Sequence, residues 1–346
     1  MPKLIRITTV PISLKLLLKN QMSYMSDKGF DVLMVSGEGK EWFDVLKNEK
    51  GIRKEVIPFT RKITPVKDIY CLWLLFKLFK REKPDIVHTH TPKAGLLGMI
   101  AAKLAGVPVK IHTLAGLPFI VEKGRKAKFL SDIEKITYRF ADEVWPNSHS
   151  LMKFIVEKKL VNPKKVRVIS EGSSNGVDLE VFDRNNLQEN HLVAATMRIV
   201  PGDDDFLILS VGRLVKDKGI ADHPRIVHVP WTNHVAHYMA ISDVLIHPSY
   251  REGFPNVLLE SGAMCCPIIC SDIPGNTDLV KHKKTALVFQ VGLVSALKEA
   301  MEFAFVRRAD MQGYAENLYQ RVIDKFERKS IQKEIYNAYN RLLEAK

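Results

Sequence analysis

The sequence predicts an α/β protein made of two halves, each with a parallel sheet covered by helices. Three observations predict this fold class. Apolar, strand-like runs alternate with segments of helical periodicity, and a length of 346 residues suits two domains of ordinary size. A turn-rich stretch between Gly176 and Asp205 is the expected linker. Ligands of open parallel sheets gather at the carboxyl ends of the strands, so two such halves would enclose a cleft.

In the first half, short runs rich in apolar and β-branched residues predict six strands, and longer 3.6-residue periods predict four helices. The strands are expected at Leu4–Thr8, Asp31–Ser36, Ile86–His90, Val109–Thr113, Glu143–Pro146 and Lys165–Ile169. The helices are expected at Ile69–Arg81, Lys93–Ala105, Ser131–Phe140 and Ser148–Glu157. The apolar stripe of Ile69–Phe79 is expected to belong to the core.

In the second half, the same signals predict five strands and at least two helices. The strands are expected at Phe206–Val211, Ile226–Val229, Asp243–His247, Pro267–Cys270 and Ala286–Phe289, and the helices at Asn256–Met264 and Val294–Ala304. The chain from Ala309 onward is helical and well charged. We expect a first domain over residues 1–180, a second over 181–320, and a C-terminal helix over 321–346 that packs back on the first.

The composition is that of a soluble globular protein, with 46% apolar and 26% charged residues. Lys77 and Lys103 interrupt the longest apolar stretches, so no segment is expected to span a membrane. Lys15 and Lys19 break the N-terminal apolar stretch, and no small-residue cleavage site follows, so we expect a cytosolic protein without a signal peptide.

Neither the cysteines nor the acidic run predicts a metal site. Zinc ligands come in pairs at known spacings, which Cys71 and the trio Cys265, Cys266 and Cys270 do not form, so reduced core cysteines are expected. Acidic runs such as Asp203-Asp204-Asp205 can hold Mg²⁺, but this one lies in the linker and is expected to be a solvated turn.

The charge is unevenly spread. Residues 1–170 hold 32 Lys and Arg against 16 Asp and Glu, a net charge of +16, whereas the remainder carries −3. Such a half attracts an anionic surface, either lipid or nucleic acid. No aromatic-rich strand motif or helix-turn-helix pattern supports nucleic acid. The basic segment 122–130, between Leu117–Val121 and Phe129–Leu130, is instead expected to rest on an anionic membrane, the alternative being a solvated loop.

The segment Arg251–Glu260 carries two carboxylates eight residues apart. Pro255 suits the first position of a helix, which would leave Glu252 in the preceding loop and Glu260 about a turn and a half inside. The unpaired N–H groups at such a helix start form an anion site, here near Phe254, Pro255, Asn256 and Val257. A sugar nucleotide needs a group at the sugar, donors at the diphosphate and an acceptor at the ribose.

A second motif, Val211–Gly219, directly follows a predicted strand. Its Arg213 and Lys218 would project from the carboxyl end of that strand, where the arginine could hold a diphosphate bidentately and the lysine as a point charge. The alternative is a solvated basic loop.

At these motifs the chain resembles the retaining glycosyltransferases of family 4, which have the GT-B fold of two facing Rossmann-like domains. The matching pieces are Gly212-Arg213-Leu214 with Lys218-Gly219, Pro248–Asn256, Glu260, Gly262–Met264 and Ser271–Gly275. In the first half, Asp85–Gly95 is similar to bacterial capsule and O-antigen transferases that act on lipid-linked sugars.

The resemblance implies a role for each residue of these motifs. Glu252 would orient the donor sugar, Glu260 would accept hydrogen bonds from the ribose, and Arg213 and Lys218 would neutralise the leaving diphosphate. It also implies a nucleotide-sugar donor, a UDP-sugar by preference, a polyprenyl-diphosphate-linked saccharide as acceptor, retention of the anomeric configuration, and no metal or other cofactor. The enzyme would be peripheral on the inner face of the cytoplasmic membrane.

Two departures from the family pattern leave other functions open. Many relatives carry a histidine where Ala115 stands, so His112, three residues earlier in the same strand segment, and His90, at a strand end, are the remaining candidates for a substrate contact. Members of the family normally have a helix, a strand and another helix, about 50 residues in all, after the position of Gly219. This chain lacks them, so its second domain is expected to be shortened. A non-catalytic GT-B-like nucleotide- or lipid-binding protein and a GT-B epimerase are the alternatives.

Overall fold

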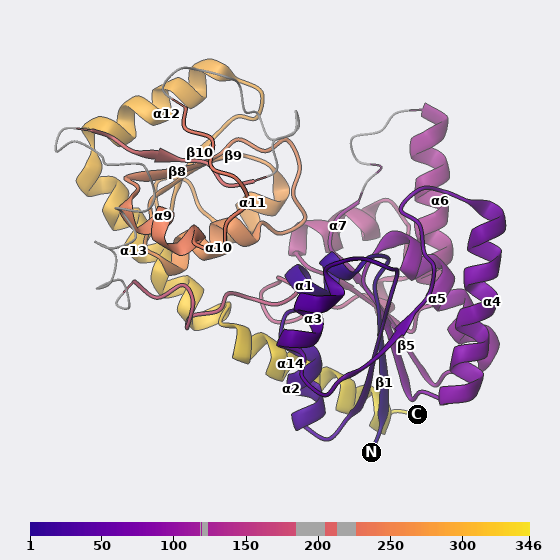
Figure 1. Ribbon diagram of the computed structural model, residues 1–346. Helices are drawn as coiled ribbons and strands as arrows, with labels where there is room; N and C mark the ends of the chain where they lie inside the picture. Colours follow the sequence, from indigo (N-terminus) through magenta and orange to yellow (C-terminus); the bar gives the residue numbers. More distant parts are fainter. Residues whose placement is uncertain (118, 120–123, 185–204, 213–225) are drawn as a thin grey trace. The chain divides into compact units, whose positions relative to one another are not determined.

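The computed structural model describes residues 1–117, 119, 124–184, 205–212 and 226–346, and it divides into two compact units (Figure 1). The first unit comprises Met1–Asn175 and Lys329–Lys346, and the second comprises Gly176–Arg328. The sequence prediction put the corresponding boundaries at 180/181 and 320/321. Each unit has its own parallel sheet and its own core.

The sheet of the first unit has six parallel strands in the order β3-β2-β1-β4-β5-β6. The strands are β1 (Lys3–Ile7), β2 (Asp31–Ser36), β3 (Arg53–Val56), β4 (Ile86–Thr89), β5 (Val109–Leu114) and β6 (Glu143–Pro146). This is the Rossmann strand order, in which the strands are added in one direction from β1 to β3 and in the opposite direction from β4 to β6. A ligand crevice is therefore expected where β1 and β4 end.

Helices cover both faces of this sheet. One face carries α4 (Pro65–Glu82), α5 (Pro92–Ala105), α6 (Gly124–Phe140) and α7 (His149–Glu157). The other carries α1 (Pro11–Leu17), α2 (Gln21–Asp27), α3 (Trp42–Asn48) and the C-terminal helix α14 (Arg328–Glu344). A proline opens α1, α4 and α5, where its missing N–H costs no hydrogen bond.

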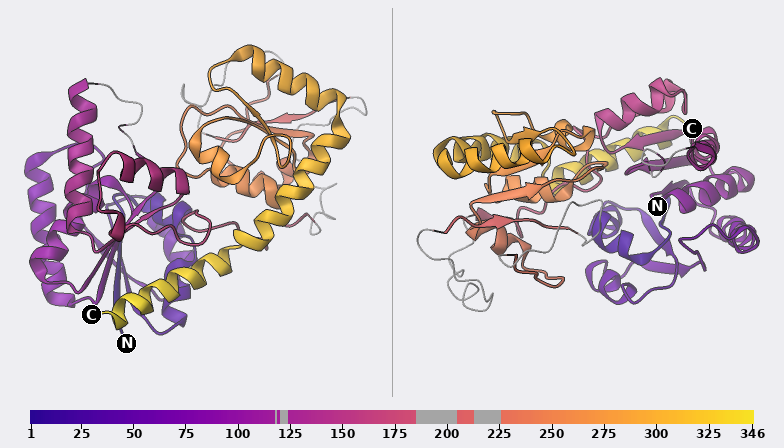
Figure 2. Two further views of the ribbon diagram at one scale, coloured as in Figure 1. Left: turned by 180° about the vertical axis from the view of Figure 1, so that it is seen from behind. Right: turned by 90° about the horizontal axis from the view of Figure 1, so that it is seen from above.

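A buried polar network fixes α14 on the first sheet, along one face of which the helix lies (Figure 2). The Tyr339 hydroxyl accepts a hydrogen bond from Arg6 Nη1 at 2.8 Å and lies 2.6 Å from His88 Nδ1. Arg6 also donates to Gln21 Oε1 at 2.6 Å and to His90 Nε2 at 3.0 Å. A guanidinium without solvent exposure needs such partners, because unpaired buried charge is costly.

Tyr339→Phe is expected to lower the free energy of unfolding by about 1–3 kcal/mol, because it leaves one buried nitrogen of Arg6 (Nη1) and one of His88 (Nδ1) without their hydrogen-bond partner. Urea denaturation followed by circular dichroism measures this loss. Tyr336→Phe, three residues earlier and also packed on Phe30, is the matched control because its hydroxyl makes no hydrogen bond to the described residues. Equal stability of the two variants would contradict the assigned role of Tyr339.

The described part of the second unit has a sheet of four parallel strands in the order β10-β9-β8-β7. These are β7 (Ile208–Leu209), β8 (Val244–His247), β9 (Ile268–Ser271) and β10 (Leu287–Phe289). One face packs on α9 (Val235–Ile241), α10 (Asn256–Ala263), α11 (Pro274–Leu279) and α13 (Arg308–Lys325), and the other on α12 (Val294–Val306). Gly262 allows α10 and α13 to approach closely, since an added Cβ would lie 2.8 Å from Val322 Cγ2.

Two predicted strands are wrong, and one strand was not predicted. Lys165–Ile169 makes a single bridge, from Val166 to Val144, because Pro163–Lys165 forms a 3₁₀ turn and Arg167 is exposed to solvent. Ile226–Val229 is irregular and exposed. The strand β3 reads Arg-Lys-Glu-Val at the sheet edge, so it lacks the apolar alternation by which strands are predicted.

Two further predictions about the chain can be compared with the described residues. All four cysteines are free and buried, as predicted. The apolar stripe of Ile69–Phe79 is only partly core, because Ile69, Tyr70 and Trp73 are exposed. Within the described ranges, no helix is both long and apolar enough to cross a bilayer.

Candidate active site

Glu252 lies in the loop that connects the carboxyl end of β8 to α10. Its Oε1 accepts a hydrogen bond from Ser249 Oγ at 3.0 Å and lies 3.2 Å from Nε2 of the buried His247, the last residue of β8. The carboxylate itself is 19% exposed. The Ser249 hydrogen bond therefore orients the carboxylate next to the His247 ring, while the side chain keeps some access to solvent.

A second set of contacts fixes the backbone of this loop. Ser271 Oγ, at the end of β9, donates to the Ser249 carbonyl at 2.5 Å, and Asn276 Nδ2 donates to the Ser271 carbonyl at 2.9 Å. At Gly275, an added Cβ would lie 2.8 Å from the Glu252 carbonyl oxygen, so only glycine lets α11 come this close to the loop. The loop position is therefore set by β9 and α11 as well as by β8.

The helix α10 begins at Asn256, the start of the predicted range, so Pro255 is its N-cap residue and not its first helical residue. Pro255 precedes the helix with φ −81° and ψ 107°, so its φ is compatible with a helix but its ψ is extended. The N–H of Leu258 already donates to the Pro255 carbonyl at 3.1 Å. The N–H groups of Asn256 and Val257 lie in the first turn, ahead of the first intrahelical bond, where an anion is favoured.

Phe254, also predicted for this site, is buried. Its ring packs on Phe326 with ring centroids 5.4 Å apart, inside the core formed by α10 and α13. Its side chain therefore anchors the loop, and only its backbone can serve an anion at the start of α10.

Glu260 lies on the second turn of α10, as predicted. Its carboxyl group is buried from solvent. Burial raises the pKa of this carboxyl to about 7, and the Arg328 cation opposes that shift. Arg328 in turn pairs with Asp178, with Nη1 and Oδ2 2.5 Å apart. The carboxyl therefore changes charge near neutral pH, where a hydrogen-bond acceptor for a ribose would have to be ionised.

Several predicted features fall outside the described residues. These are Arg213 and Lys218, the shortened stretch after Gly219, and Asp203 and Asp204 of the acidic run. The diphosphate clamp thus stays a prediction. Among the residues that the structure does describe, no three His, Cys, Asp or Glu side chains gather as a metal site would require.

The two histidines predicted to contact substrate lie on opposite faces of the first sheet. His90 directly follows β4 and is buried, with its ring centroid 4.1 Å from that of His88. Because Arg6 Nε donates to His90 Nε2, the ring proton of a neutral His90 is on Nδ1, for which the described residues offer no partner.

His112 faces the helices on the other side of the sheet. Its Nδ1 lies 2.8 Å from Thr89 Oγ1, and its ring fills the space beside Gly95, where an added Cβ would lie 2.5 Å from Cε1. With 1% of its surface exposed, it is placed as a core histidine, which speaks against the predicted sugar contact. Burial also lowers its pKa to about 4.

Glu134, on α6, is a buried carboxyl in the same layer, and burial raises its pKa to about 7. Below pH 4.5 it is protonated in both the folded and the unfolded chain. Between about pH 4.5 and 7 only the unfolded chain ionises, so stability falls as pH rises. Glu134→Gln is expected to be about 3 kcal/mol more stable than the wild type at pH 8 and nearly equal at pH 4, measured by urea denaturation. Parallel pH profiles of the two proteins would contradict this account.

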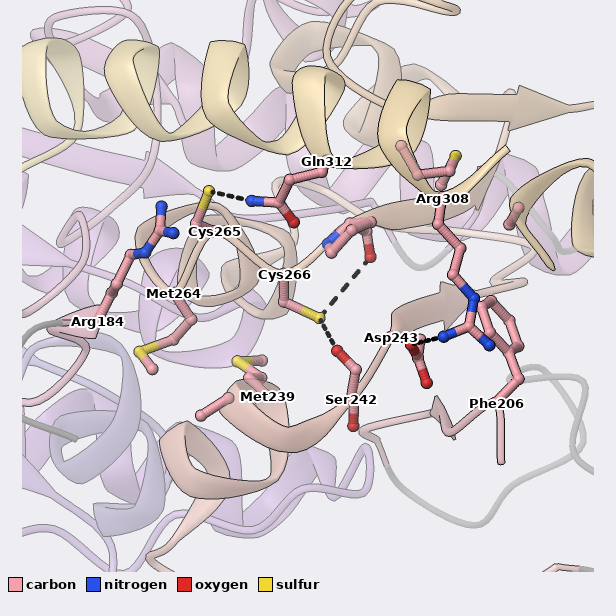
Figure 3. Close-up of a pocket in the computed structure, with 14 residues that line it drawn as sticks. Arg184, Phe206, Met239, Ser242, Asp243, Met264, Cys265, Cys266, Arg308 and Gln312 are labelled. Atoms are coloured by element: carbon pink, nitrogen blue, oxygen red, sulfur yellow. Dashed lines mark hydrogen bonds and ion pairs between the residues drawn. The ribbon is translucent and has the colours of Figure 1, made fainter. Parts of the chain in front are cut away.

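The second unit also contains a cavity of about 350 Å³, lined by Arg184, Asp243, Cys266, Arg308 and Gln312 among others (Figure 3). It lies where β7, β8 and β9 begin, since Asp243 directly precedes β8 and Cys266 stands two residues before β9. Glu252 instead follows the end of β8. The strands are parallel, so the cavity lies at their amino ends and the Glu252 loop at their carboxyl ends. This cavity is therefore not the predicted sugar site.

The structure adds four residues to the site that the sequence did not single out. Ser249 hydrogen-bonds Glu252 and His247 lies beside it, while Arg328, paired with Asp178, opposes the effect of burial on Glu260. The first two carried a signal, because they stand at the end of a predicted strand. Arg328 carried none, because it is 68 positions from Glu260 in the sequence.

The chain matches two protein families and several individual relatives. Residues 18–172 match the glycosyl transferase 4-like domain, and residues 222–321 match the glycosyl transferases group 1 family. The chain is 30% identical to the capsular polysaccharide biosynthesis glycosyltransferase CapM of Staphylococcus aureus, over 99% of this chain and 97% of the relative. That alignment has 382 positions, more than the 346 residues here, so the relative has residues without a counterpart in this chain.

A second relative and two solved structures agree with this match. The chain is 30% identical to a UDP-Gal:α-D-GlcNAc-diphosphoundecaprenol α-1,3-galactosyltransferase of Escherichia coli, over 81% of both chains. A glycosyltransferase from Rickettsia africae has a TM-score of 0.81 at 18% identity, covering 99% of this chain and 98% of its own. Anabaena HepE in complex with UDP and glucose has a TM-score of 0.79 at 15% identity, covering 98% and 100%. These structures have the GT-B fold, as predicted for this chain.

Proposed function

This chain belongs to the GT-B glycosyltransferases, with a 4-like N-terminal domain and a group 1 C-terminal domain, and we propose that it transfers a sugar from a UDP-sugar to a lipid-linked saccharide in bacterial surface polysaccharide assembly. The proposal includes retention of the anomeric configuration and catalysis without a metal or other cofactor.

The placement of Glu252 is the observation that carries this proposal. Ser249 hydrogen-bonds its carboxylate, which lies 3.2 Å from His247 Nε2 at the carboxyl end of β8, where open parallel sheets bind ligands. The first turn of α10 follows within four residues and offers N–H groups for phosphate. Glu260 lies one turn further along the same helix. One short segment thus carries groups suited to the sugar, the diphosphate and the ribose.

The bond that breaks joins the anomeric carbon to an oxygen of the diphosphate, so negative charge develops on the leaving group. The helix field at Asn256 and Val257 favours that charge, and Arg213 and Lys218 would neutralise it. Each well-placed donor in a site that excludes water contributes about 3 kcal/mol to such a transition state. Glu252 would orient the sugar so that the acceptor hydroxyl bonds to the anomeric carbon on the face that the diphosphate leaves.

The nature of donor and acceptor is supported by the relatives. The E. coli relative is named for a UDP-Gal donor and a diphosphoundecaprenol-linked acceptor, and a Campylobacter jejuni relative is likewise named for a diphospho-undecaprenol acceptor. HepE has been solved with UDP-glucose. An acceptor with a polyprenyl chain stays in the membrane, so the enzyme would be peripheral on the anionic inner face of the cytoplasmic membrane. The net charge of +16 over residues 1–170 suits that surface.

Turnover by the full-length protein tests the proposal. A panel of nucleotide sugars is offered together with a polyprenyl-diphosphate-linked saccharide in detergent, and UDP release and the extended glycolipid are measured. Product from one UDP-sugar supports transfer. Nucleotide binding without turnover by any donor would overturn it in favour of a non-catalytic GT-B-like binding protein. Conversion of a UDP-N-acetylhexosamine without acceptor would indicate an epimerase.

A further inference from the structure

The helix α4 presents an apolar stripe to solvent. We call Val66, Ile69, Tyr70 and Trp73 the α4 outer stripe; they are 85%, 68%, 51% and 47% exposed. Their spacing of 0, 3, 4 and 7 residues places them on one face of the helix. Ile63, just before the helix, is also 60% exposed. A contiguous set of large apolar side chains on a surface marks a site of interaction with a protein or a membrane.

The outer stripe is separate from the face of α4 that stabilises the fold. Cys71, Leu75, Leu78 and Phe79 are buried and pack in the core under α4 and α5. The helix lies at the outer margin of the first unit in all three views (Figures 1 and 2). Burial of the inner face accounts for the helix, so the apolar outer face needs another explanation.

Cations accompany the outer stripe. Residues 61–83 contain seven Lys and Arg and two acidic residues. Both acids are engaged by cations: Asp68 pairs with Lys93 at 2.7 Å, and Glu82 pairs with Arg53 and Arg81 at 3.1 Å. The Lys77 ammonium lies 3.7 Å from the centre of the Trp73 ring, on the outer side of the helix. The surface therefore combines exposed apolar groups with an excess of positive charge.

We propose that the α4 outer stripe lies in the interface of an anionic lipid bilayer. Trp and Tyr are the side chains that prefer the headgroup level, and here Tyr70 and Trp73 stack with ring centroids 5.9 Å apart. Lysines beside them match lipid phosphates. A second copy of the chain fits less well, because interface cores are depleted in lysine and the same positive charge would face itself.

This inference rests on the proposed function, since a membrane-bound acceptor requires an enzyme at the membrane. It also changes where the contact lies. The sequence prediction placed it at residues 122–130, of which 122 and 123 lie outside the described residues. The following helix α6 exposes two large apolar side chains, Phe129 and Ile136, seven positions apart, whereas α4 exposes four within eight residues.

Sedimentation of the full-length protein with vesicles tests the inference. The vesicles contain either phosphatidylglycerol and phosphatidylcholine or phosphatidylcholine alone. Val66→Gln with Ile69→Gln is expected to lower partitioning onto the anionic vesicles at least tenfold. Lys67→Gln with Lys77→Gln is expected to lower it about 25-fold, since each lysine near the surface contributes about fivefold.

A matched control is available on α12 of the second unit. Val294 and Val306 are 80% and 74% exposed, so Val294→Gln with Val306→Gln removes as much exposed apolar surface elsewhere. This control is expected to bind anionic vesicles within twofold of the wild type. Thermal unfolding checks that all variants are folded. Brominated lipids report contact directly, because they should quench wild-type tryptophan emission and quench Trp73→Phe much less.

Three outcomes would overturn the inference. The first is that the α4 variants bind vesicles as well as the wild type does. The second is that the α12 control loses as much vesicle binding as the α4 variants. The third is a wild-type dimer, seen by light scattering, that the α4 variants lose without a change in vesicle binding. UDP release is measured in parallel with a short-chain, water-soluble acceptor. Its absence would count against transferase activity and not against the membrane contact, so the two proposals can fail separately.

Discussion

Glu252→Gln is expected to lower kcat by about 10²- to 10³-fold while leaving the KM for the UDP-sugar within about threefold of the wild type. Glutamine has the size of glutamate and can still accept the hydrogen bond from Ser249 Oγ. It lacks the negative charge that lies 3.2 Å from His247 Nε2, and it cannot accept hydrogen bonds from sugar hydroxyls at both terminal atoms. The change therefore removes orientation of the reacting sugar but leaves the nucleotide contacts in place.

Steady-state kinetics of UDP release, with the donor varied at saturating acceptor, measures this effect. Glu302→Gln is the control, because Glu302 is an exposed carboxylate of the same unit on α12, paired with Lys298. A Glu252→Gln enzyme with a much higher KM and an unchanged kcat would assign Glu252 to nucleotide binding instead. Activity equal to that of the control would remove Glu252 from the site.

Glu260→Ala is expected to weaken binding of the nucleotide about 10- to 100-fold, with a smaller effect on kcat. Hydrogen bonds to a charged acceptor contribute about 1.5–3 kcal/mol each, and the proposed role gives Glu260 the ribose hydroxyls. Titration calorimetry with UDP measures the loss without turnover. Glu302→Gln again serves as control, and a larger loss of kcat than of affinity would exchange the roles assigned to Glu252 and Glu260.

The raised pKa of Glu260 adds a pH dependence to the same experiment. Burial raises that pKa to about 7, so the carboxyl is largely protonated at pH 6 and largely ionised at pH 8. Only the ionised form accepts hydrogen bonds at all its lone pairs, so the affinity for UDP is expected to increase as pH rises through 7. Glu260→Gln is expected to bind UDP more weakly at pH 8 and without this increase. An identical pH profile in Glu260→Gln and the wild type would contradict the assignment.

Local sequence patterns predicted the elements that are buried and regular. Asp31–Ser36 was predicted with the bounds of β2, because an unbroken apolar run between polar turns has few other conformations available. The polar edge strand β3 was missed and the exposed run Ile226–Val229 was wrongly made a strand. Both errors concern segments whose conformation depends on whether a neighbouring strand is present, which a local pattern does not contain.

The candidate site divides in the same way. The spacing of Glu252 and Glu260 around a helix start could be read from ten consecutive residues, and the structure has Glu252 in the loop and Glu260 in α10. The approach of Gly275 to the loop and the Ser271 hydrogen bond come from the packing of β9 and α11. His112 was chosen because it stands near Ala115 in the sequence, but residues three apart on a strand point to opposite faces, and its ring packs beside Thr89 and Gly95.

Residue patterns alone predicted the α/β class, the two carboxylates of one loop-helix segment, and the concentration of positive charge in the first half. These follow from periodicity and composition, which act over a few residues or need no geometry. The folded structure was needed to find that Arg328 lies close enough to Glu260 to oppose the burial that raises its pKa, and that one face of α4 is core while the other is exposed. Burial and charge environment depend on segments far apart in the chain, so they exist only once the chain has folded.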